Sequence, residues 1–484
     1  MLNVSTINLA GLGIGVFILT LLYRRLASPI ARIPGPEISN WTELVYSYYW
    51  LTGKAPIYVH HLHETYGPIV RTSPTQVDIC DTSAVKEIHR TNTTFRKSTW
   101  YSTFVTGHVH NLFSATDPAF HGTRRRLLAS PMADSSLQRV QPVIESHIRL
   151  AVSKMRQEIQ TRGVTDVYQW WFFMATDIIG ELTFGESFRM LETGKKTQYI
   201  LDLETVASSG PIRTTFPNLL KIAPYLPLSA IKRVAERGKR IVQYAEQSVQ
   251  RYKNMIAQNP ENPKPTLFTK LFDTEKSGLT FDDIRQEAQS YIIAGSDTTT
   301  VTMTYLTHAV SSDTRIRDKL VAELASLPAD FSDNDLRNLP YLKIVILETL
   351  RLYSAVPFGL PRTVPREGAN LVGYQIPAGV TVSTQAYSLH RDPAIFPDPF
   401  KFVPERWESP TKEMKDASLP FGGGSRICLG IHLAYREMRL ATALFFREFP
   451  QARPSTKEGM SDDDMTMKAW FLMAPKGYRC LMEA

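Results

Sequence analysis

The loop Phe421-Gly422-Gly423-Gly424-Ser425-Arg426-Ile427-Cys428-Leu429-Gly430 carries a cysteine near its end and precedes a stretch, 431–449, whose pattern predicts a helix. Glycines let backbone pass close to a flat ligand because they have no Cβ to collide with it. The helix start directs amide groups at the sulfur, where partial positive charge favours thiolate over thiol. Arg426 is placed to meet a carboxylate at the ligand's edge. The loop therefore predicts a haem held by a cysteine thiolate.

Two simpler interpretations compete with this one. A lone cysteine is usually a small buried hydrophobic residue without a ligand. A glycine-rich loop can also cradle phosphate, but this loop lacks the Lys-Ser or Lys-Thr ending of a P-loop. The combination of glycines, arginine and cysteine favours haem over both.

The fixed positions of the loop, Phe421, Gly424, Arg426, Cys428 and Gly430, resemble the haem-binding signature of the cytochrome P-450 family. The resemblance implies a mainly α fold with minor β, the haem-thiolate fold of that family. It further implies that Cys428 is the axial ligand of the iron in haem (iron protoporphyrin IX). Phe421 and Gly430 would shape the haem-binding loop, and O2 would be the co-substrate.

A long predicted helix opens at Thr280 with a capping-box pattern and carries Ala294-Gly295-Ser296-Asp297-Thr298-Thr299 at its middle. Small residues leave room for a flat ligand, and the Thr298 hydroxyl can bond the carbonyl of Ala294, which tends to open a helix. Taken alone, this run would be a threonine-rich buried helix. It matches the family's A-G-x-D-T-T oxygen-activation motif, which implies that Asp297 and Thr298 are catalytic and deliver protons to oxygen.

Further arginines are candidates for the haem propionates. The run Arg124-Arg125-Arg126 alone would be a solvated helix start. The family has an aromatic residue four positions before a propionate-binding arginine, and His121 and Arg125 occupy those places. The register among the three arginines stays open, and we predict Arg125. Arg362, in Leu360-Pro361-Arg362, resembles the arginine that contacts the second propionate.

Glu348 and Arg351 are spaced i, i+3 on a helix expected to start near Leu339, so both side chains share one face. Such pairs are usually exposed and worth little. The apolar run at 344–347 predicts burial instead, where an ion pair needs additional partners. The family's E-x-x-R pair meets a later arginine, and Arg406 is placed to supply it. We interpret this triad as structural.

Residues 7–23 are almost wholly apolar and approach the ~20 residues that span a bilayer as a helix. Arginines follow at 24, 25 and 32, which places the rest of the chain in the cytosol. A cleaved signal peptide is the alternative, but the basic flank is on the wrong side and no A-x-A site follows. We expect a membrane anchor at 1–25, a proline-rich hinge at 26–36 and one catalytic domain at 37–484. Resemblance to microsomal members implies a single-pass protein of the endoplasmic reticulum membrane.

The amino-acid composition narrows the possible compartment and partners of the protein. Three cysteines cannot form a disulfide framework, which favours a reducing compartment. A net charge of +8 suits an anionic surface, but no nucleic-acid-binding motif accompanies it. No segment binds flavin or NADPH, so the resemblance implies electrons from NADPH through a separate NADPH–cytochrome P-450 reductase. We expect its docking face to include five arginines near the cysteine: Arg124, Arg125, Arg126, Arg436 and Arg439.

The predicted function is a haem-thiolate monooxygenase that hydroxylates or epoxidises a lipophilic small molecule. The stretches 98–115, 292–296, 356–360 and 471–473 should line its pocket, and their composition is mostly apolar and aromatic. The sequence most resembles fungal members of secondary metabolism. Two alternatives stay open: a haem-thiolate isomerase or dehydratase that needs no reductase, and a haem-binding membrane sensor without enzymatic activity.

Overall fold

The computed structural model describes residues 28–104, 109–216, 229–258 and 278–484, with a few positions between 12 and 25 and between 264 and 268. These residues form a mainly helical body with four small sheets, as the sequence predicts. The described helices are α2 (Leu44–Leu51), α3 (Ala55–Tyr66), α4 (Thr82–His89), α5 (Pro118–Ala129), α6 (Asp134–Leu137), α7 (Gln141–Arg162), α8 (Val167–Phe184), α9 (Met190–Thr193), α10 (Gln198–Ser208), α11 (Gly210–Thr215), α13 (Ser229–Gln258), α15 (Phe281–Ser312), α16 (Thr314–Ala325), α17 (Asp333–Arg337), α18 (Pro340–Leu352), α19 (Ala386–Leu389), α20 (Lys412–Ala417) and α21 (Ile431–Glu448).

Short 3-10 turns and strands complete the described elements. The turns are η1 (Glu37–Asn40), η2 (Thr99–Phe104), η3 (Gln138–Val140), η5 (Pro404–Trp407), η6 (Gly424–Arg426), η7 (Lys457–Gly459) and η8 (Asp462–Met465). The strands are β1 (Ile69–Ser73), β2 (Gln76–Ile79), β3 (Arg96–Lys97), β4 (Thr165–Asp166), β5 (Arg362–Thr363), β6 (Ala369–Leu371), β7 (Tyr374–Ile376), β8 (Thr381–Ser383), β9 (Arg453–Pro454), β10 (Met467–Ala469), β11 (Met473–Pro475) and β12 (Leu481–Glu483).

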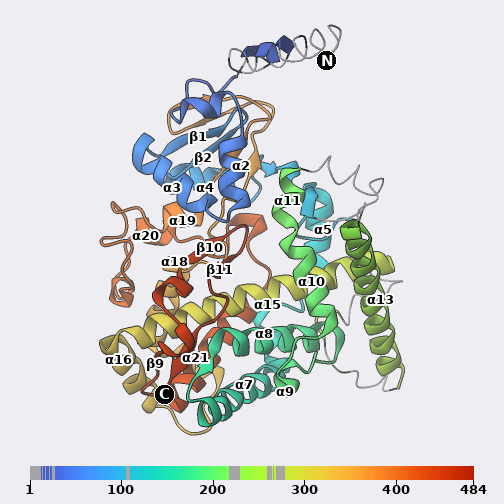
Figure 1. Cartoon of the computed structure of the whole chain (residues 1–484), viewed down its shortest axis with the longest axis vertical. Helices are drawn as coiled ribbons and strands as arrows, with labels where there is room; N and C mark the ends of the chain where they lie inside the picture. The colour runs from blue at the N-terminus through green and yellow to red at the C-terminus, as the bar shows by residue number, and fades with distance from the viewer. Residues whose placement is uncertain are drawn as a thin grey trace, which may run out of the picture.

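Helix α15 runs through the middle of the body, with α8 packed along it and α7 beyond α8 (Figure 1). It begins with the predicted capping box, in which Thr280 and Asp283 bond each other's backbone N–H groups. Helix α8 is buried almost throughout, with Trp171, Phe172 and Phe173 among its core residues. Helix α21, which follows the cysteine loop, also contacts α15. The two candidate motifs are therefore carried by neighbouring helices.

The largest sheet joins segments that are distant in the sequence, in the order β1-β2-β8-β5-β3. Strands β1 and β2 are antiparallel, with Ile69 opposite Ile79. Strand β5 pairs with β3 so that Arg362 lies opposite Lys97. Strand β6 pairs with β7 as a separate hairpin, while β8 joins the larger sheet and α19 follows it.

The membrane anchor expected at 1–25 falls mostly outside the described residues. Among the positions that the structure does describe, no helix has both the length and the apolar character to cross a bilayer.

Glu348 is the centre of a buried network that fixes the segment before the cysteine loop. Its Oε1 accepts from Arg351 at 2.8 Å, from the Val403 N–H at 2.9 Å and from Arg406 at 3.0 Å. Its Oε2 accepts from Arg351 at 2.8 Å and from the Trp407 indole at 2.9 Å. Both members of the helical pair are 0% exposed, so the contacts of the predicted triad are confirmed.

Arg351 extends the same network to the backbone of the following loops. It donates to the carbonyl oxygens of His390, Pro399 and Lys401 at 2.7–3.0 Å. A buried guanidinium needs this many acceptors because water cannot satisfy it. The network therefore ties α18 to the chain at 390–407, which leads into the cysteine loop.

We predict that Glu348→Ala leaves little folded, haem-loaded protein. Removing one member of a buried pair leaves the other uncompensated, at a cost of about 3–5 kcal/mol in the free energy of unfolding. Thermal unfolding and haem content per chain measure the effect. The matched control is Glu145→Ala, which removes an exposed i, i+4 partner of Arg149 and should change stability by less than about 1 kcal/mol. Full haem loading of the Glu348 variant would contradict the structural role.

Candidate haem site

A cavity of about 1530 Å³ lies between the middle of α15 and the loop that carries Cys428. All four stretches predicted to line the pocket contribute, with Phe104, Ile293, Phe358 and Phe471 as examples. Its aromatic wall is tightly packed, since Phe104 and Phe471 have ring centroids 5.7 Å apart and Phe358 and Phe471 6.2 Å apart. The cavity combines an apolar wall with a small set of charged side chains.

Cys428 presents its side chain to this cavity. The loop is closed by the Cys428 N–H, which donates to the Phe421 carbonyl at 2.9 Å. Gly424 has φ +59°, and a Cβ there would stand 1.8 Å from the carbonyl oxygen of His89 in α4, so only glycine fits. Gly430 closes the loop with no side chain against the sulfur.

The protonation of Cys428 departs in part from the sequence expectation. The Gly430 N–H does point at the sulfur, and with nearby Arg125 it lowers the pKa of the thiol. Burial within the protein is the larger influence and raises that pKa above its usual value. The helix start alone therefore does not stabilise the thiolate.

A cluster of four cationic side chains lines part of the same cavity: Lys97, Arg125, Arg362 and Arg426. Each donates to a backbone carbonyl, Lys97 to Phe113, Arg125 to Ile427, Arg362 to Pro361 and Arg426 to Ala115. Among the described residues, none of the four forms an ion pair within 4 Å. Burial, and then the charges of Arg362 and Arg426, hold the pKa of Lys97 well below its usual value.

A ligand with two carboxylates fits this arrangement. Burial and Arg362 lower the pKa of Arg426 to about 10, which shows that the cations disfavour one another. Carboxylates placed among them would reverse that penalty through charge-assisted hydrogen bonds. With a sulfur donor on the same cavity, the residues present fit haem, through Cys428 for the iron and the four cations for the propionates.

His121 is buried beside this cluster, where the resemblance places an aromatic residue. Burial and the surrounding cations, Arg426 first, lower the pKa of His121 to about 3. The imidazole is therefore neutral at physiological pH and can donate one N–H to an anion.

Lys97 is a site residue that the sequence did not reveal, and it lies beside Tyr101, which belongs to the predicted stretch 98–115. Lys97 Nζ lies 4.0 Å from the ring centroid of Tyr101, and the Tyr101 hydroxyl is 3.5 Å from Arg362 Nη1. Lys97 enters the site because β3 pairs with β5, a contact between residues far apart in the chain. Nothing in the local sequence of Arg96-Lys97 predicts that this dipeptide pairs with β5.

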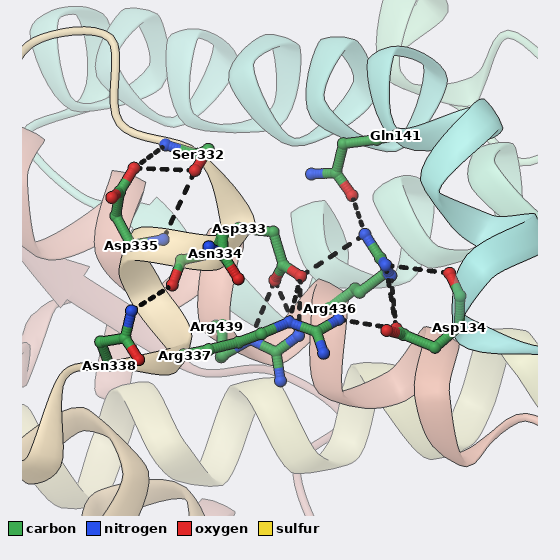
Figure 2. A network of polar contacts seen from close by, with 10 residues as sticks. All are labelled: Asp134, Gln141, Ser332, Asp333, Asn334, Asp335, Arg337, Asn338, Arg436 and Arg439. Atoms are coloured by element: carbon green, nitrogen blue, oxygen red, sulfur yellow. Dashed lines mark hydrogen bonds and ion pairs between the residues drawn. The ribbon is translucent and has the colours of Figure 1, made fainter.

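The expectation of a docking face built from five arginines is wrong for four of them. Arg124 is buried and pairs with Asp283 at 2.7 Å, while Arg125 faces the cavity and Arg126 stays exposed. Arg436 pairs with Asp134 at 2.9 Å, and Arg439 pairs with Asp333 at 2.7 Å (Figure 2).

The network in Figure 2 has a structural role instead. Asp134 belongs to α6 and Asp333 to α17, and both carboxylates receive bonds from α21. Arg337 bridges the two acids, at 2.6 Å from Asp134 and 2.9 Å from Asp333. These contacts neutralise the arginines and fix the helix that follows Cys428.

On the opposite wall, the Thr298 hydroxyl donates to the Ala294 carbonyl at 2.7 Å, as the sequence predicts. Helix α15 nevertheless continues without interruption through this turn, so the expected opening is not seen. Gly295 is required for helix packing, because a Cβ at this position would stand 2.8 Å from Ile179 of α8. The glycine sets how closely α8 approaches α15.

Asp297 lines the cavity together with Tyr168, Lys196, Glu204 and Tyr478. Burial, with a contribution from the Glu204 charge, raises the pKa of Asp297 to about 7. Lys196 pairs with Glu204 at 2.5 Å, so it is only partly available to Asp297. A carboxyl group with this pKa can both hold and release a proton near neutral pH.

Glu437 is a second buried acid that the sequence did not single out. Its Oε2 accepts a hydrogen bond from the Thr299 hydroxyl at 2.9 Å, which joins α21 to α15 beside the Thr298 turn. Burial raises the pKa of Glu437 to about 8. The contact couples the helix behind Cys428 to the helix that carries Asp297.

The family model for cytochrome P-450 matches residues 35–482. A cytochrome P-450 monooxygenase of Aspergillus terreus, tazI, is 51% identical over 471 residues, which cover 97% of this chain and 96% of that protein. A cytochrome P-450 monooxygenase of Aspergillus niger, orf2, is 47% identical over 479 residues, covering 98% and 97%. The monooxygenase aflV of Aspergillus parasiticus is 34% identical, covering 96% and 93%.

We predict that Cys428→Ala abolishes the strongly red-shifted Soret band that thiolate-ligated haem shows after reduction and CO binding. The reason is that Cys80 and Cys480 do not line the cavity, so neither can replace the sulfur. The spectrum of the purified variant is compared with that of Cys80→Ala, which should keep the band. A retained band in the Cys428 variant would exclude it as the ligand.

We also predict that Lys97→Gln weakens haem retention about ten-fold or more, because a charge-assisted hydrogen bond is worth about 1.5–3 kcal/mol. Haem transfer to an excess of a haem-scavenging globin measures the rate of loss. Arg96→Gln is the control, since Arg96 precedes Lys97 on β3 but is exposed. Equal haem loss from both variants would remove Lys97 from the site.

Proposed function

We propose that this chain, which belongs to the cytochrome P-450 family, is a monooxygenase that inserts one oxygen atom of O2 into a lipophilic small molecule. The family uses haem iron and O2, with electrons from NADPH delivered by a reductase. The observation that carries the proposal is one cavity with Cys428 on one wall and Asp297 and Thr298 on the other.

Cys428 would ligate the iron, while Arg125, Arg362, Arg426 and Lys97 would bind the propionates. Phe421 and Gly430 would shape the loop beneath the ring. When bound, the haem supplies the activation of O2 and the transfer of one of its oxygen atoms.

The chain's own contribution on the opposite wall is to hold and move protons. The Thr298 hydroxyl, fixed by its bond to Ala294, can orient a water molecule toward the reacting oxygen. Asp297 can resupply the proton, because its pKa of about 7 leaves a large protonated fraction at neutral pH. A purely haem-binding sensor would not need such a pair.

Substrate and partner are proposed from the walls of the cavity and from the relatives. The aromatic wall that includes Phe104, Phe358 and Phe471 suits a lipophilic substrate that is hydroxylated or epoxidised. The Aspergillus monooxygenases support a place in fungal secondary metabolism. We further propose a separate reductase as electron donor, the division into 1–25, 26–36 and 37–484, and anchoring in the endoplasmic reticulum membrane.

The function is tested with the full-length holoprotein, NADPH, a fungal NADPH–cytochrome P-450 reductase and ¹⁸O2. Extracts from a fungal host that lacks this protein provide the substrates. A product that carries one ¹⁸O atom, and forms only with NADPH and reductase, supports the proposal. An unlabelled product formed without reductase would support the isomerase or dehydratase alternative instead.

We predict that Thr298→Ala lowers product per NADPH while hydrogen peroxide rises by the same amount, because protons no longer reach the correct oxygen. Asp297→Asn should slow NADPH consumption about a hundred-fold, as general acids contribute about 10²–10⁴. Product, peroxide and NADPH are measured together. Thr300→Ala is the control, since its hydroxyl makes the same kind of bond, to Ser296, but does not line the cavity.

The pH dependence follows from the raised pKa of Asp297. Below pH 7 the carboxyl group is mostly protonated and can donate, and above pH 7 the protonated fraction falls about ten-fold per unit. NADPH consumption should therefore decline as pH rises through 7 in the wild type and stay flat in Asp297→Asn. Unchanged coupling in Thr298→Ala, or a loss confined to substrate affinity, would remove the pair from the mechanism.

A further inference from the structure

Arg213, in the short helix α11, is a cavity-lining cation that the haem does not account for. Its helix packs against η2, which carries Trp100 and Phe104, and against α2. The neighbouring Thr214 hydroxyl accepts a hydrogen bond from the Trp50 indole at 3.0 Å. Arg213 therefore belongs to the aromatic wall, where a substrate would be held.

The guanidinium of Arg213 has no acidic partner among the described residues. Its Nε is buried and makes no hydrogen bond there. Residues 217–235, which follow along the chain, include no aspartate or glutamate. A buried donor left without an acceptor costs free energy, and arginine cannot shed its proton to avoid that cost. Such a group is retained more readily where a ligand satisfies it.

Three further cations that line this cavity already have acidic partners. Lys196 pairs with Glu204, Arg237 lies 4.0 Å from Asp202, and Arg285 pairs with Asp282 at 2.9 Å. The four cations near Cys428 perturb one another's pKa values, whereas burial alone lowers the pKa of Arg213. The charges of the proposed propionate site therefore do not contribute to the pKa of Arg213.

We propose that Arg213 binds an anionic oxygen of the substrate, so that this monooxygenase takes lipophilic aromatic acids. The inference rests on the proposed function. A guanidinium meets a carboxylate with two parallel hydrogen bonds, which orients the ligand as well as binding it. The aromatic wall receives the apolar body of the same molecule by stacking.

A phospholipid headgroup offers the same anionic oxygen. Ile212 and Phe216, on either side of Arg213, are 52% and 44% exposed, so a lipid source must be distinguished from a substrate. The experiment therefore has one arm in uncharged detergent without phospholipid and one arm with anionic vesicles.

The test uses full-length holoprotein and two probes, 1-pyrenebutyric acid and its methyl ester. Binding is followed by quenching of pyrene fluorescence and by the shift of the Soret band. The wild type should bind the acid at least ten-fold more tightly than the ester. Arg213→Gln should weaken only the acid and bring the two within about three-fold, and Arg213→Lys should keep part of the preference because it retains the charge.

Arg285→Gln is the matched control, because Arg285 lines the cavity but already has an acidic partner, and it should leave the preference unchanged. Equal binding of acid and ester by the wild type, or an unaltered preference in Arg213→Gln, would overturn the inference. So would a loss confined to binding of phosphatidylserine vesicles.

The reduced, CO-bound spectrum of each sample is recorded first. A failed acid preference in correctly loaded protein therefore counts against Arg213 alone, and failed ¹⁸O incorporation counts against the proposed function.

Discussion

The structure depends on a repulsion: four mutually interacting cationic side chains line one part of a buried cavity, and none of these four has an acidic partner among the described residues. Each comes from a different element, Lys97 from β3, Arg125 from α5, Arg362 from β5 and Arg426 from the cysteine loop. Burial, and then the like charges of Arg362 and Arg426, make a charged Lys97 unfavourable, so its pKa lies well below the usual value. A dianionic ligand offsets it, so haem binding and the stability of this region are coupled.

Around this repulsion, two hydrogen-bonded networks of acids and arginines hold the neighbouring elements in place. Glu348 receives five hydrogen bonds and holds the chain before the loop, while Asp134 and Asp333 neutralise the arginines of α21 behind it. Buried ion pairs of this kind contribute less to net stability than to the choice of a single arrangement. Here that arrangement keeps Cys428 and Arg426 facing one cavity. The arginines around the loop thus form two groups: some pair with an acidic side chain, and the others have no acidic partner in the described part of the chain and are available to bind a ligand.

This division also explains what the sequence predicted and what it did not. Local spacing determines contacts between residues that are three or four positions apart in the chain. These are the capping box at Thr280, the Thr298–Ala294 bond and the Glu348–Arg351 pair. The mainly α fold followed from the family resemblance that those motifs carry. Lys97 and the acids that meet Arg436 and Arg439 are set by contacts across 100 residues or more, which leave no local pattern. The docking face was therefore predicted wrongly, because the sequence shows that a residue is arginine but not which acid it pairs with.

The same reasoning applies within the cavity, where charge and position together define what each group can do. Asp297 and Glu437 are both buried acids on facing helices, yet Glu437 has its bond from Thr299 while Asp297 lies among Glu204, Lys196 and two tyrosines. Burial raises both pKa values and both side chains line the cavity, but Asp297 lies among other titratable groups, whereas Glu437 is hydrogen-bonded to Thr299. Glu437, held by one hydroxyl between α15 and α21, instead fixes the spacing of the two walls. A raised pKa marks both acids, and only their neighbours separate a proton donor from a structural link.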